Sequence, residues 1–252
     1  MTRDRETLVL EREELSPGIF SLTLSAGEDF LREAGPGRFV QVEVSPGPFP
    51  LVRRPFTVNR TDAGSFRIVF EVKGRGTDEL SHLTEGARLR VLGPLGSGYR
   101  LLPGRWLLIG GGMGAAGFPC LADRIDCGLV LLGASSASRL LEVGGFSSMC
   151  ATEDGSRGAR GLVTDLLDRV RWDDFSNVAL CGPVAMMKAV AGRLPDAILE
   201  VTQVSAEARM GCGWGACEGC SIPASGGGYL KCCSDGPVVP ATSIDWDLWE
   251  GV

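Results

Sequence analysis

The chain has 252 residues, of which 44% are hydrophobic and 22% are charged, and its formal net charge is −6. This composition is that of a globular protein with one large or two medium domains, and an acidic chain without a lysine- or arginine-rich block is a poor candidate for nucleic-acid binding. No apolar stretch reaches the ~18 residues of a membrane span, and the N-terminus has no apolar signal region, so neither membrane insertion nor export is expected.

Residues 1–101 are expected to form an antiparallel β-barrel, because short strand-like runs recur at regular spacing between turns rich in Pro, Gly and Asp. These runs are TLVLERE, IFSLTLSA, RFVQVEV, FRIVFEVKG and ARLRVLGP. The segment GPLGSG, residues 93–98, marks the exit from the barrel, where a plain interdomain turn is the simplest interpretation.

Two motifs in this first part could bind phosphate. RPFT, residues 54–57, ends a strand-like run, and arginine is well suited to a bidentate phosphate contact. GRGT, residues 74–77, precedes the helical run DELSHLTEG, and a helix N-terminus with Gly and Thr donors is an anion site. Thr77 could equally cap that helix, so both roles stay open.

Residues 102–205 alternate between buried strand-like runs and helical runs, which is the pattern of a doubly wound parallel sheet with crossover helices. The strand-like runs are RWLLIGGG, GLVLLGA, SMCATEDG, NVALCGP and ILEVTQ. The helical runs are FPCLADRID, SRLLEVGGF, GLVTDLLDRV and VAMMKAVAGRL.

Three loops of this second part follow expected strands, at the edge where ligands bind in open α/β sheets. The loop GGGMG, residues 110–114, could admit a pyrophosphate, but it is not the stronger G-x-G-x-x-G pattern and could be a tight turn. CGP at residues 181–183 and TEDGS at residues 152–156 could also be ordinary turns taken singly. Together the three loops would surround one crevice.

Residues 206–252 are distinguished by four cysteines with the spacing C-x4-C-x2-C-x12-C. They are Cys212, Cys217, Cys220 and Cys233. This is the spacing of plant-type ferredoxins, which supplies the four thiolates of a 2Fe–2S cluster. A structural zinc site is the alternative, although such sites usually use C-x2-C pairs and only Cys217 and Cys220 form one. Cys232 adjoins Cys233, and spacing alone does not say which of the two is the ligand.

The chain contains nine cysteines and one histidine, His82. Cysteines without a signal sequence indicate a reducing compartment, so a cytoplasmic protein with thiols available to metal is expected. A single histidine argues against a Cys–His nucleophilic pair and a His-rich metal site. The C-terminal tail adds Trp246 and Trp249 beside acidic residues, which suits either a partner contact or packing on the protein's own core.

Taken in order, RPFT, GRGT, GPLGSG, GGGMG, TEDGS, CGP and the C-terminal cysteines resemble the ferredoxin reductase-type flavoprotein family over nearly the whole chain. Within it, the similarity is to electron-transfer subunits of dihydroorotate dehydrogenase B. In those subunits a comparable E-x-R-M precedes the first cluster cysteine, as Glu207–Met210 does here, and C-x-D-G-P-V follows the last. That second motif begins here at Cys233, so the resemblance selects Cys233 over Cys232.

The resemblance implies FAD bound by the first part, NAD(H) by the second and a 2Fe–2S cluster by the third. It places RPFT along the flavin, GRGT at the FAD diphosphate, and GGGMG and CGP against the nicotinamide nucleotide. The residues so implied are Arg54, Pro55, Phe56, Thr57, Gly74, Gly76, Thr77, Gly111, Gly112, Gly114, Cys181, Gly182 and Pro183. Cys181 could instead be a small buried hydrophobic residue, but the loop is expected to expose it near the nicotinamide.

The resemblance also implies an oxidoreductase subunit that passes electrons between NAD(H) and a partner through FAD and the cluster, with no catalytic side chain of its own. The implied partner is the FMN-containing dihydroorotate dehydrogenase catalytic subunit of pyrimidine biosynthesis, in a heterotetramer. One alternative is an NAD(P)H–ferredoxin reductase-type subunit of a transhydrogenase or sulfhydrogenase complex, and another is a zinc-bound, non-enzymatic interaction module. Nucleotide preference stays open, because four residues could contact a 2′-phosphate. These are Ser135, Ser136, Arg139 and Arg157.

Overall fold

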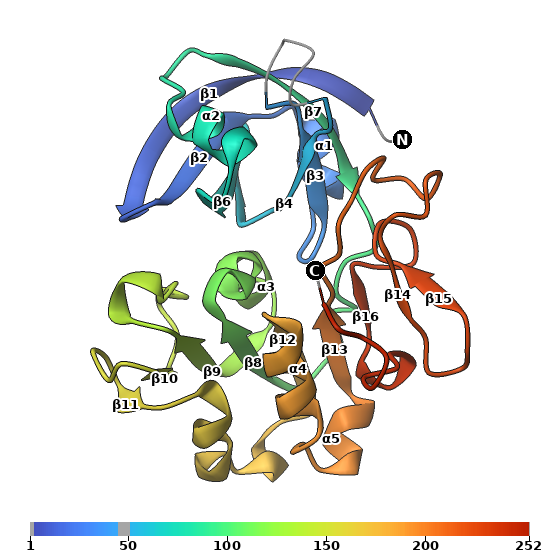
Figure 1. Cartoon of the computed structure of the whole chain (residues 1–252). Helices are drawn as coiled ribbons and strands as arrows, with labels where there is room; N and C mark the ends of the chain where they lie inside the picture. The colour runs from blue at the N-terminus through green and yellow to red at the C-terminus, as the bar shows by residue number, and fades with distance from the viewer. Residues whose placement is uncertain (1–2, 45–50, 252) are drawn as a thin grey trace.

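The computed structural model describes residues 3–44 and 51–251, and arranges them in two seven-stranded sheets and a two-stranded hairpin (Figure 1). Figure 1 shows the first sheet, in blue to teal, above the second, in green to orange. The C-terminal segment, in red, runs along one side of both. No helix in the described part of the chain is long and apolar enough to cross a membrane.

The first sheet is antiparallel throughout and has the strand order β4-β3-β7-β1-β2-β6-β5. Its strands are β1 (Arg3–Ser16), β2 (Ile19–Ser25), β3 (Phe39–Val42), β4 (Arg54–Thr57), β5 (Arg60–Asp62), β6 (Ser65–Glu71) and β7 (Arg88–Leu95). Its helices are α1 (Glu28–Glu33) and α2 (Arg75–Ser81).

Alternation of side chains explains why this sheet curls around its own core. In β7, Leu89 and Val91 are buried while Arg88 and Arg90 are exposed, as expected for a strand with one face on a core. β4 lies against β6, which brings the two ends of the sheet together. The antiparallel barrel predicted from the sequence is therefore confirmed.

The second sheet has the order β11-β10-β9-β8-β12-β13-β16 and is parallel except for β16. Its strands are β8 (Arg105–Gly111), β9 (Asp126–Ala134), β10 (Ser148–Thr152), β11 (Ala159–Arg160), β12 (Asn177–Cys181), β13 (Thr202–Ser205) and β16 (Val238–Pro240). Its α-helices are α3 (Phe118–Ala122), α4 (Val184–Ala191) and α5 (Asp196–Glu200). Its 3-10 helices are η1 (Gly112–Gly117), η2 (Ala137–Arg139), η3 (Val163–Arg169) and η4 (Trp172–Asp174).

β8 and β12 are buried over nearly their whole length, which is typical of central strands covered on both faces. Apolar side chains fill both sides of them: Leu107 and Ile109 belong to one core cluster, and Trp106 and Leu108 to another. The predicted doubly wound parallel sheet is confirmed, with one antiparallel strand added at its edge.

Three elements of the second part differ from the sequence-based prediction. The run SRLLEVGGF contributes only to the single turn η2, which ends at Arg139 because the backbone of Leu140 is already extended. Gly145, further along the run, has φ +84° and is not helical either. The run GLVTDLLDRV forms the 3-10 helix η3 instead of an α-helix. The run ILEVTQ is divided between α5 and β13, since Pro195 starts a short helix before the strand begins at Thr202.

The C-terminal segment returns to both sheets. It contains β14 (Ser221–Pro223), β15 (Tyr229–Lys231), β16 and η5 (Ala241–Ser243). Beyond the pairing of β16 with β13, the N–H of Ser97 donates to the carbonyl of Gly236 at 2.6 Å, and the N–H of Val238 donates to the carbonyl of Ser97 at 3.3 Å. The barrel exit GPLGSG is thus also the attachment point of the C-terminal segment.

The two tryptophans of the tail pack on the protein's own core. Trp249 is 6% exposed, and its ring centroid lies 5.8 Å from that of Trp246. Trp246 Nε1 donates to the carbonyl of Ala241 at 3.0 Å. Of the two interpretations of this tail, the structure supports internal packing.

Candidate functional site

The loops after β8 and β12 meet at the carboxyl edge of the second sheet, where the strand order changes direction. Gly114 lies so close to the end of β12 that an added Cβ would be 2.6 Å from the carbonyl carbon of Cys181 and from the Cα of Gly182. A Cβ on Gly182 would in turn lie 3.1 Å from the backbone nitrogen of Gly111. Only glycine fits such an approach, and it leaves backbone N–H groups facing a ligand.

A cavity of about 960 Å³ opens above these loops, which is within the usual size of a cofactor site. We call it the nucleotide cavity. It is lined by both glycine loops, by the end of β9 and by the start of η3. The residues implied for nicotinamide binding that line it are Gly111, Gly112, Gly114, Gly182 and Pro183.

The residues that could contact a 2′-phosphate differ in their positions and in their ion pairs. Ser135 and Arg139 line the nucleotide cavity, and Arg139 Nη1 lies 2.8 Å from the Glu71 carboxylate of β6. Arg157 forms an ion pair with Glu142. Both guanidinium groups therefore already have carboxylate partners, and Arg139 links the second sheet to the barrel across the cavity.

A second cavity of about 490 Å³, which we call the flavin cavity, lies between the barrel and the second sheet. All four residues of RPFT line it, so Arg54, Pro55, Phe56 and Thr57 are brought to one site. The opposite wall is Ser205–Met210, the segment that leaves β13. Its volume and its mixture of polar and apolar lining residues are those of a cofactor site.

The GRGT turn lies next to this cavity without lining it. A Cβ on Gly76 would lie 3.3 Å from Arg54 Nε, so glycine here makes room for the arginine of RPFT. The Thr77 hydroxyl accepts from the N–H of Lys73 at 2.9 Å and donates to the carbonyl of Gly74 at 3.0 Å. Thr77 therefore stabilises the turn before α2, and a role at the FAD diphosphate stays a prediction for Gly74, Gly76 and Thr77.

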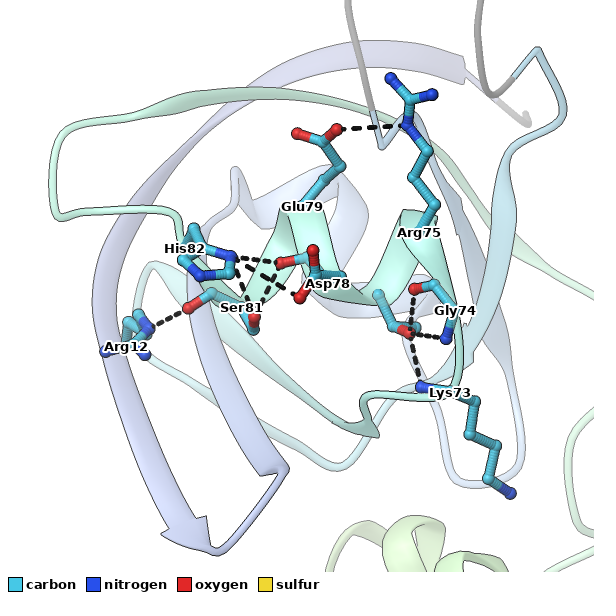
Figure 2. A network of polar contacts seen from close by, with 9 residues as sticks. Arg12, Lys73, Gly74, Arg75, Asp78, Glu79, Ser81 and His82 are labelled. Atoms are coloured by element: carbon cyan, nitrogen blue, oxygen red, sulfur yellow. Dashed lines mark hydrogen bonds and ion pairs between the residues drawn. The ribbon is translucent and has the colours of Figure 1, made fainter.

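The other end of α2 is fixed by a separate polar network (Figure 2). Ser81 Oγ donates to the carbonyl of Asp78 at 2.7 Å, and His82 Nδ1 lies 2.8 Å from the same oxygen. Arg12 Nε donates to the Ser81 carbonyl at 2.6 Å, which fastens the helix end to β1. Figure 2 shows Lys73 pointing away from this network, at the opposite end of the helix. The single histidine is thus structural.

Glu207 lies where the two cavities meet. It lines both of them, together with a narrow pocket beside Cys181. Solvent reaches its side chain through the cavities, although protein atoms surround the carboxylate on most sides. That burial raises the pKa of Glu207, and the positive charge of Lys73 offsets the rise only in part. A carboxyl with a raised pKa between two ligand cavities is typical of a functional site.

Cys181 is buried, contrary to the expectation that its loop would expose it. It is 5% exposed and packs in the core beside Ala179 and Leu108. Gly114 covers its backbone, as described above. Burial, followed by the charge of Glu207, raises the pKa of the Cys181 thiol far above its ordinary value. Cys181 lines the narrow pocket but neither of the two larger cavities.

The four predicted ligand cysteines come from two segments that meet: Cys212, Cys217 and Cys220 lie between β13 and β14, and Cys233 follows β15. The thiols of Cys212 and Cys217 contact each other, and so do those of Cys220 and Cys233. Backbone N–H groups point at their sulfurs: Trp214 N donates to Cys212 Sγ at 3.4 Å, and Gly215 N donates to Cys233 Sγ at 3.0 Å. Such N–H···S contacts are the arrangement that surrounds iron–sulfur clusters, so the residues present fit a 2Fe–2S cluster.

The protonation of Cys212 is consistent with metal binding. Burial is the largest single effect and raises its pKa, but hydrogen bonds from the backbone N–H of Trp214, Cys217 and Ala216 together outweigh it and lower the pKa to about 6. The thiol is therefore largely thiolate at neutral pH, the form that binds metal.

In the described part of the chain, no three His, Cys, Asp or Glu side chains are arranged to hold a single metal ion.

Cys232 and Cys233 differ in position more than in acidity. Burial raises the pKa of each thiol to about 12. Both residues are nearly fully buried, at 2% and 3% exposed, and both belong to the same apolar core cluster. They differ in that Cys233 Sγ accepts from Gly215 N and contacts the Cys220 thiol. Geometry thus supports Cys233 as the fourth ligand.

Sequence analysis assigns no binding role to the Ser205–Met210 wall of the flavin cavity. It also assigns none to Glu71, Lys73 and Met113, which line both cavities. Glu207 enters the sequence analysis only as part of the E-x-R-M motif. The available signal was position: residues that directly follow a parallel strand lie at the ligand-binding edge of the sheet. For Glu71 and Lys73, which belong to the barrel, no local pattern points to the site.

Comparison with known proteins agrees with this geometry. The family model of the iron–sulfur cluster binding domain of dihydroorotate dehydrogenase B matches residues 207–245. A protein of Lysinibacillus sphaericus named dihydroorotate dehydrogenase B (NAD(+)), electron transfer subunit, is 33% identical, over 97% of this chain and 99% of its own. The protein of that name from Desulforamulus reducens is 35% identical, over 98% of this chain and 100% of its own.

Solved structures show the same architecture. A chain of the NADH-dependent reduced ferredoxin–NADP oxidoreductase superposes with a TM-score of 0.84 and 28% identity, over 96% of this chain and 90% of that one. A ferredoxin NADP+ reductase from Neisseria gonorrhoeae with bound FAD and NADP has a TM-score of 0.61 at 16% identity, over 74% of this chain and 88% of its own, and so shares the fold.

Proposed function

The chain belongs to the family of dihydroorotate dehydrogenase B electron-transfer subunits, and from that premise we propose which residues hold its cofactors and where its electrons leave. It is an NAD-linked oxidoreductase subunit that works with FAD and a 2Fe–2S cluster. Bound FAD accepts hydride from NADH and releases single electrons, which is the conversion that a cluster requires.

The observation that supports the proposed route is that the flavin cavity continues directly into residues 211–220, which we call the cluster loop. Met210 lines the flavin cavity, and Cys212 follows it after one intervening glycine. The nucleotide cavity adjoins the same flavin cavity at Glu207 and Met113. The three sites are therefore consecutive, in the order nicotinamide nucleotide, flavin, cluster.

We assign RPFT (Arg54, Pro55, Phe56 and Thr57) to the flavin, the two glycine loops to the nicotinamide nucleotide, and four cysteines to the cluster. The cysteines are Cys212, Cys217, Cys220 and Cys233. NAD is proposed over NADP, because Arg139 and Arg157 are already paired with carboxylates. The nine cysteines are all free, which supports a reducing, cytoplasmic setting.

The partner we propose is an FMN-containing catalytic subunit of dihydroorotate dehydrogenase, assembled with this chain as a heterotetramer. In support, the cluster loop faces outward: Trp214 is 63% exposed and Cys217 is exposed. Tyr229, on the adjacent hairpin, is 72% exposed. Exposed aromatic residues beside a redox centre suit a docking surface. The likeness to the ferredoxin–NADP oxidoreductase keeps a transhydrogenase-type complex as the second candidate.

Anaerobically purified protein is expected to contain one FAD and about two irons per chain, with a flavin spectrum superimposed on that of a 2Fe–2S cluster. Iron analysis, zinc analysis and flavin extraction on the same sample measure this load. Stoichiometric zinc without iron would contradict it and would favour the zinc-bound interaction module.

Replacing Cys217 by Ser is expected to leave the reduction of FAD by NADH unchanged and to stop electron transfer to the flavin of the partner. The reason is that Cys217 belongs to the exposed cluster loop and lines neither cavity. Stopped-flow absorbance of both flavins in the complex measures the two steps separately. Cys150→Ser, a half-buried cysteine outside the loop, is the matched control. Normal transfer between the flavins without a cluster would rule out this exit route.

A further inference from the structure

Gln41 presents a buried side-chain amide that the fold itself does not satisfy. Gln41 is 1% exposed, and within the described part of the chain neither its Nε2 nor its Oε1 has a hydrogen-bond partner. Leaving a buried amide unpaired is costly, whereas an apolar residue of the same size would fit without that cost. A polar group retained in such a place points to a partner outside the polypeptide.

The position of Gln41 identifies that partner. On β3, Val40 and Val42 point into the barrel core, so Gln41 between them points out of it. There it meets the cluster loop: an added Cβ on Gly213 would lie 2.9 Å from Gln41 Cγ and 3.1 Å from Gln41 Nε2. Gly213 directly follows the ligand Cys212 and has φ +82°. The amide nitrogen is thus aimed at the backbone that wraps the cluster.

Two cofactors could be the partner of Gln41, the flavin and the cluster, and the observations favour the cluster. Phe39 and Pro55, the neighbours of Gln41 on β3 and β4, line the flavin cavity, but Gln41 does not. The cluster loop already directs backbone N–H groups at the sulfurs of Cys212 and Cys233. A side-chain N–H from the barrel would extend the same set of donors from the opposite side.

We propose that the Gln41 side-chain amide donates a hydrogen bond to a sulfur of the 2Fe–2S cluster and raises its reduction potential. This inference rests on the proposed function, because it requires the cluster. Reduction adds negative charge to the cluster, and an N–H donor stabilises that charge, so the donor makes reduction more favourable. Gln41 is then a positioning residue on the route from flavin to cluster, although it belongs to the barrel and lies far from the cysteines in sequence.

The chain offers an internal control, because it contains only two glutamines, Gln41 and Gln203. Gln203 is also buried, but its amide is fully paired: Oε1 accepts from Arg100 N at 2.8 Å, and Nε2 donates to Arg100 O at 3.0 Å. The holoprotein is labelled with side-chain ¹⁵N glutamine, its cluster is reduced, and pulsed EPR measures the coupling between the cluster spin and ¹⁵N. This first measurement needs no substitution.

We expect a ¹⁵N coupling in the wild type that is lost in Gln41→Leu and kept in Gln203→Leu. Redox titration is expected to show a more negative cluster potential for Gln41→Leu, with unchanged iron content. A normal cluster signal without ¹⁵N coupling would overturn the inference and would indicate that the Gln41 amide binds an ordered water. A coupling that survives in Gln41→Leu would also overturn it, because that coupling would come from Gln203. Absence of any cluster signal in the wild type would instead contradict the proposed function itself.

Discussion

Replacing Cys233 by Ser should abolish the cluster, whereas replacing its neighbour Cys232 should leave most of it in place. Cys233 Sγ accepts a hydrogen bond from Gly215 N at 3.0 Å and contacts Cys220, so it lies against the cluster loop. Cys232 belongs to the same apolar core cluster, but the Gly215 N–H donates to Cys233 Sγ. Serine lacks the thiolate that iron requires, and loss of one of four ligands removes the closed coordination of the cluster.

EPR of the dithionite-reduced variants and iron content per chain measure this difference. Because Cys232 is buried, Cys232→Ser places a hydroxyl in the core and is expected to lower thermal stability, which Cys232→Ala avoids. Cys232→Ala therefore accompanies it as a control for packing. A cluster that survives in Cys233→Ser but not in either Cys232 variant would mean that the fourth ligand has been assigned to the wrong cysteine.

Replacing Gly114 by Ala should slow the reduction of FAD by NADH on the order of 10²-fold, the loss that a displacement of about 1 Å in a reacting pair produces. The added methyl would lie 2.6 Å from the backbone of Cys181 and Gly182, which cannot yield as a flexible side chain does. The two glycine loops would separate, and the nicotinamide would lose its place beside the flavin.

FAD and cluster content should be unchanged in Gly114→Ala, because the flavin cavity and the cysteine loop do not include that residue. Stopped-flow reduction of the flavin by NADH, with dithionite reduction as the reference, separates nucleotide binding from cofactor loss. Gly144→Ala is the matched control, since a Cβ there meets nothing within 4 Å and the residue is exposed. Wild-type kinetics in Gly114→Ala would contradict the assignment of this loop to the nucleotide.

The sequence was informative where function depends on local spacing. The spacing of the cluster cysteines can be read directly from the sequence, and so can a glycine where a loop must approach a ligand. The structure brings Cys212 and Cys233 together, as that cysteine spacing predicts. The periodicity of β7 and the apolar run of β8 likewise follow from local alternation and burial.

What the sequence did not show depends on contacts between distant segments. Gln41 lies opposite Gly213, and no pattern around either residue announces that contact. The antiparallel addition of β16 and the meeting of Glu71 with Arg139 are of the same kind. The run SRLLEVGGF has helical periodicity, but its backbone is already extended at Leu140.

The walls of the flavin cavity come from both ends of the polypeptide, and this has a consequence for biosynthesis. Residues 54–57 are translated before Ser205–Met210 and Pro237, which also line the cavity. A ribosome-bound chain can fold its barrel as a unit, yet it has only half of the cavity. FAD insertion is therefore expected only after Ser205–Met210 has been made, and the flavin would then stabilise only molecules in which this segment has docked. Chains that stop before Ser205–Met210 would lack that wall of the cavity and would be expected to bind no flavin.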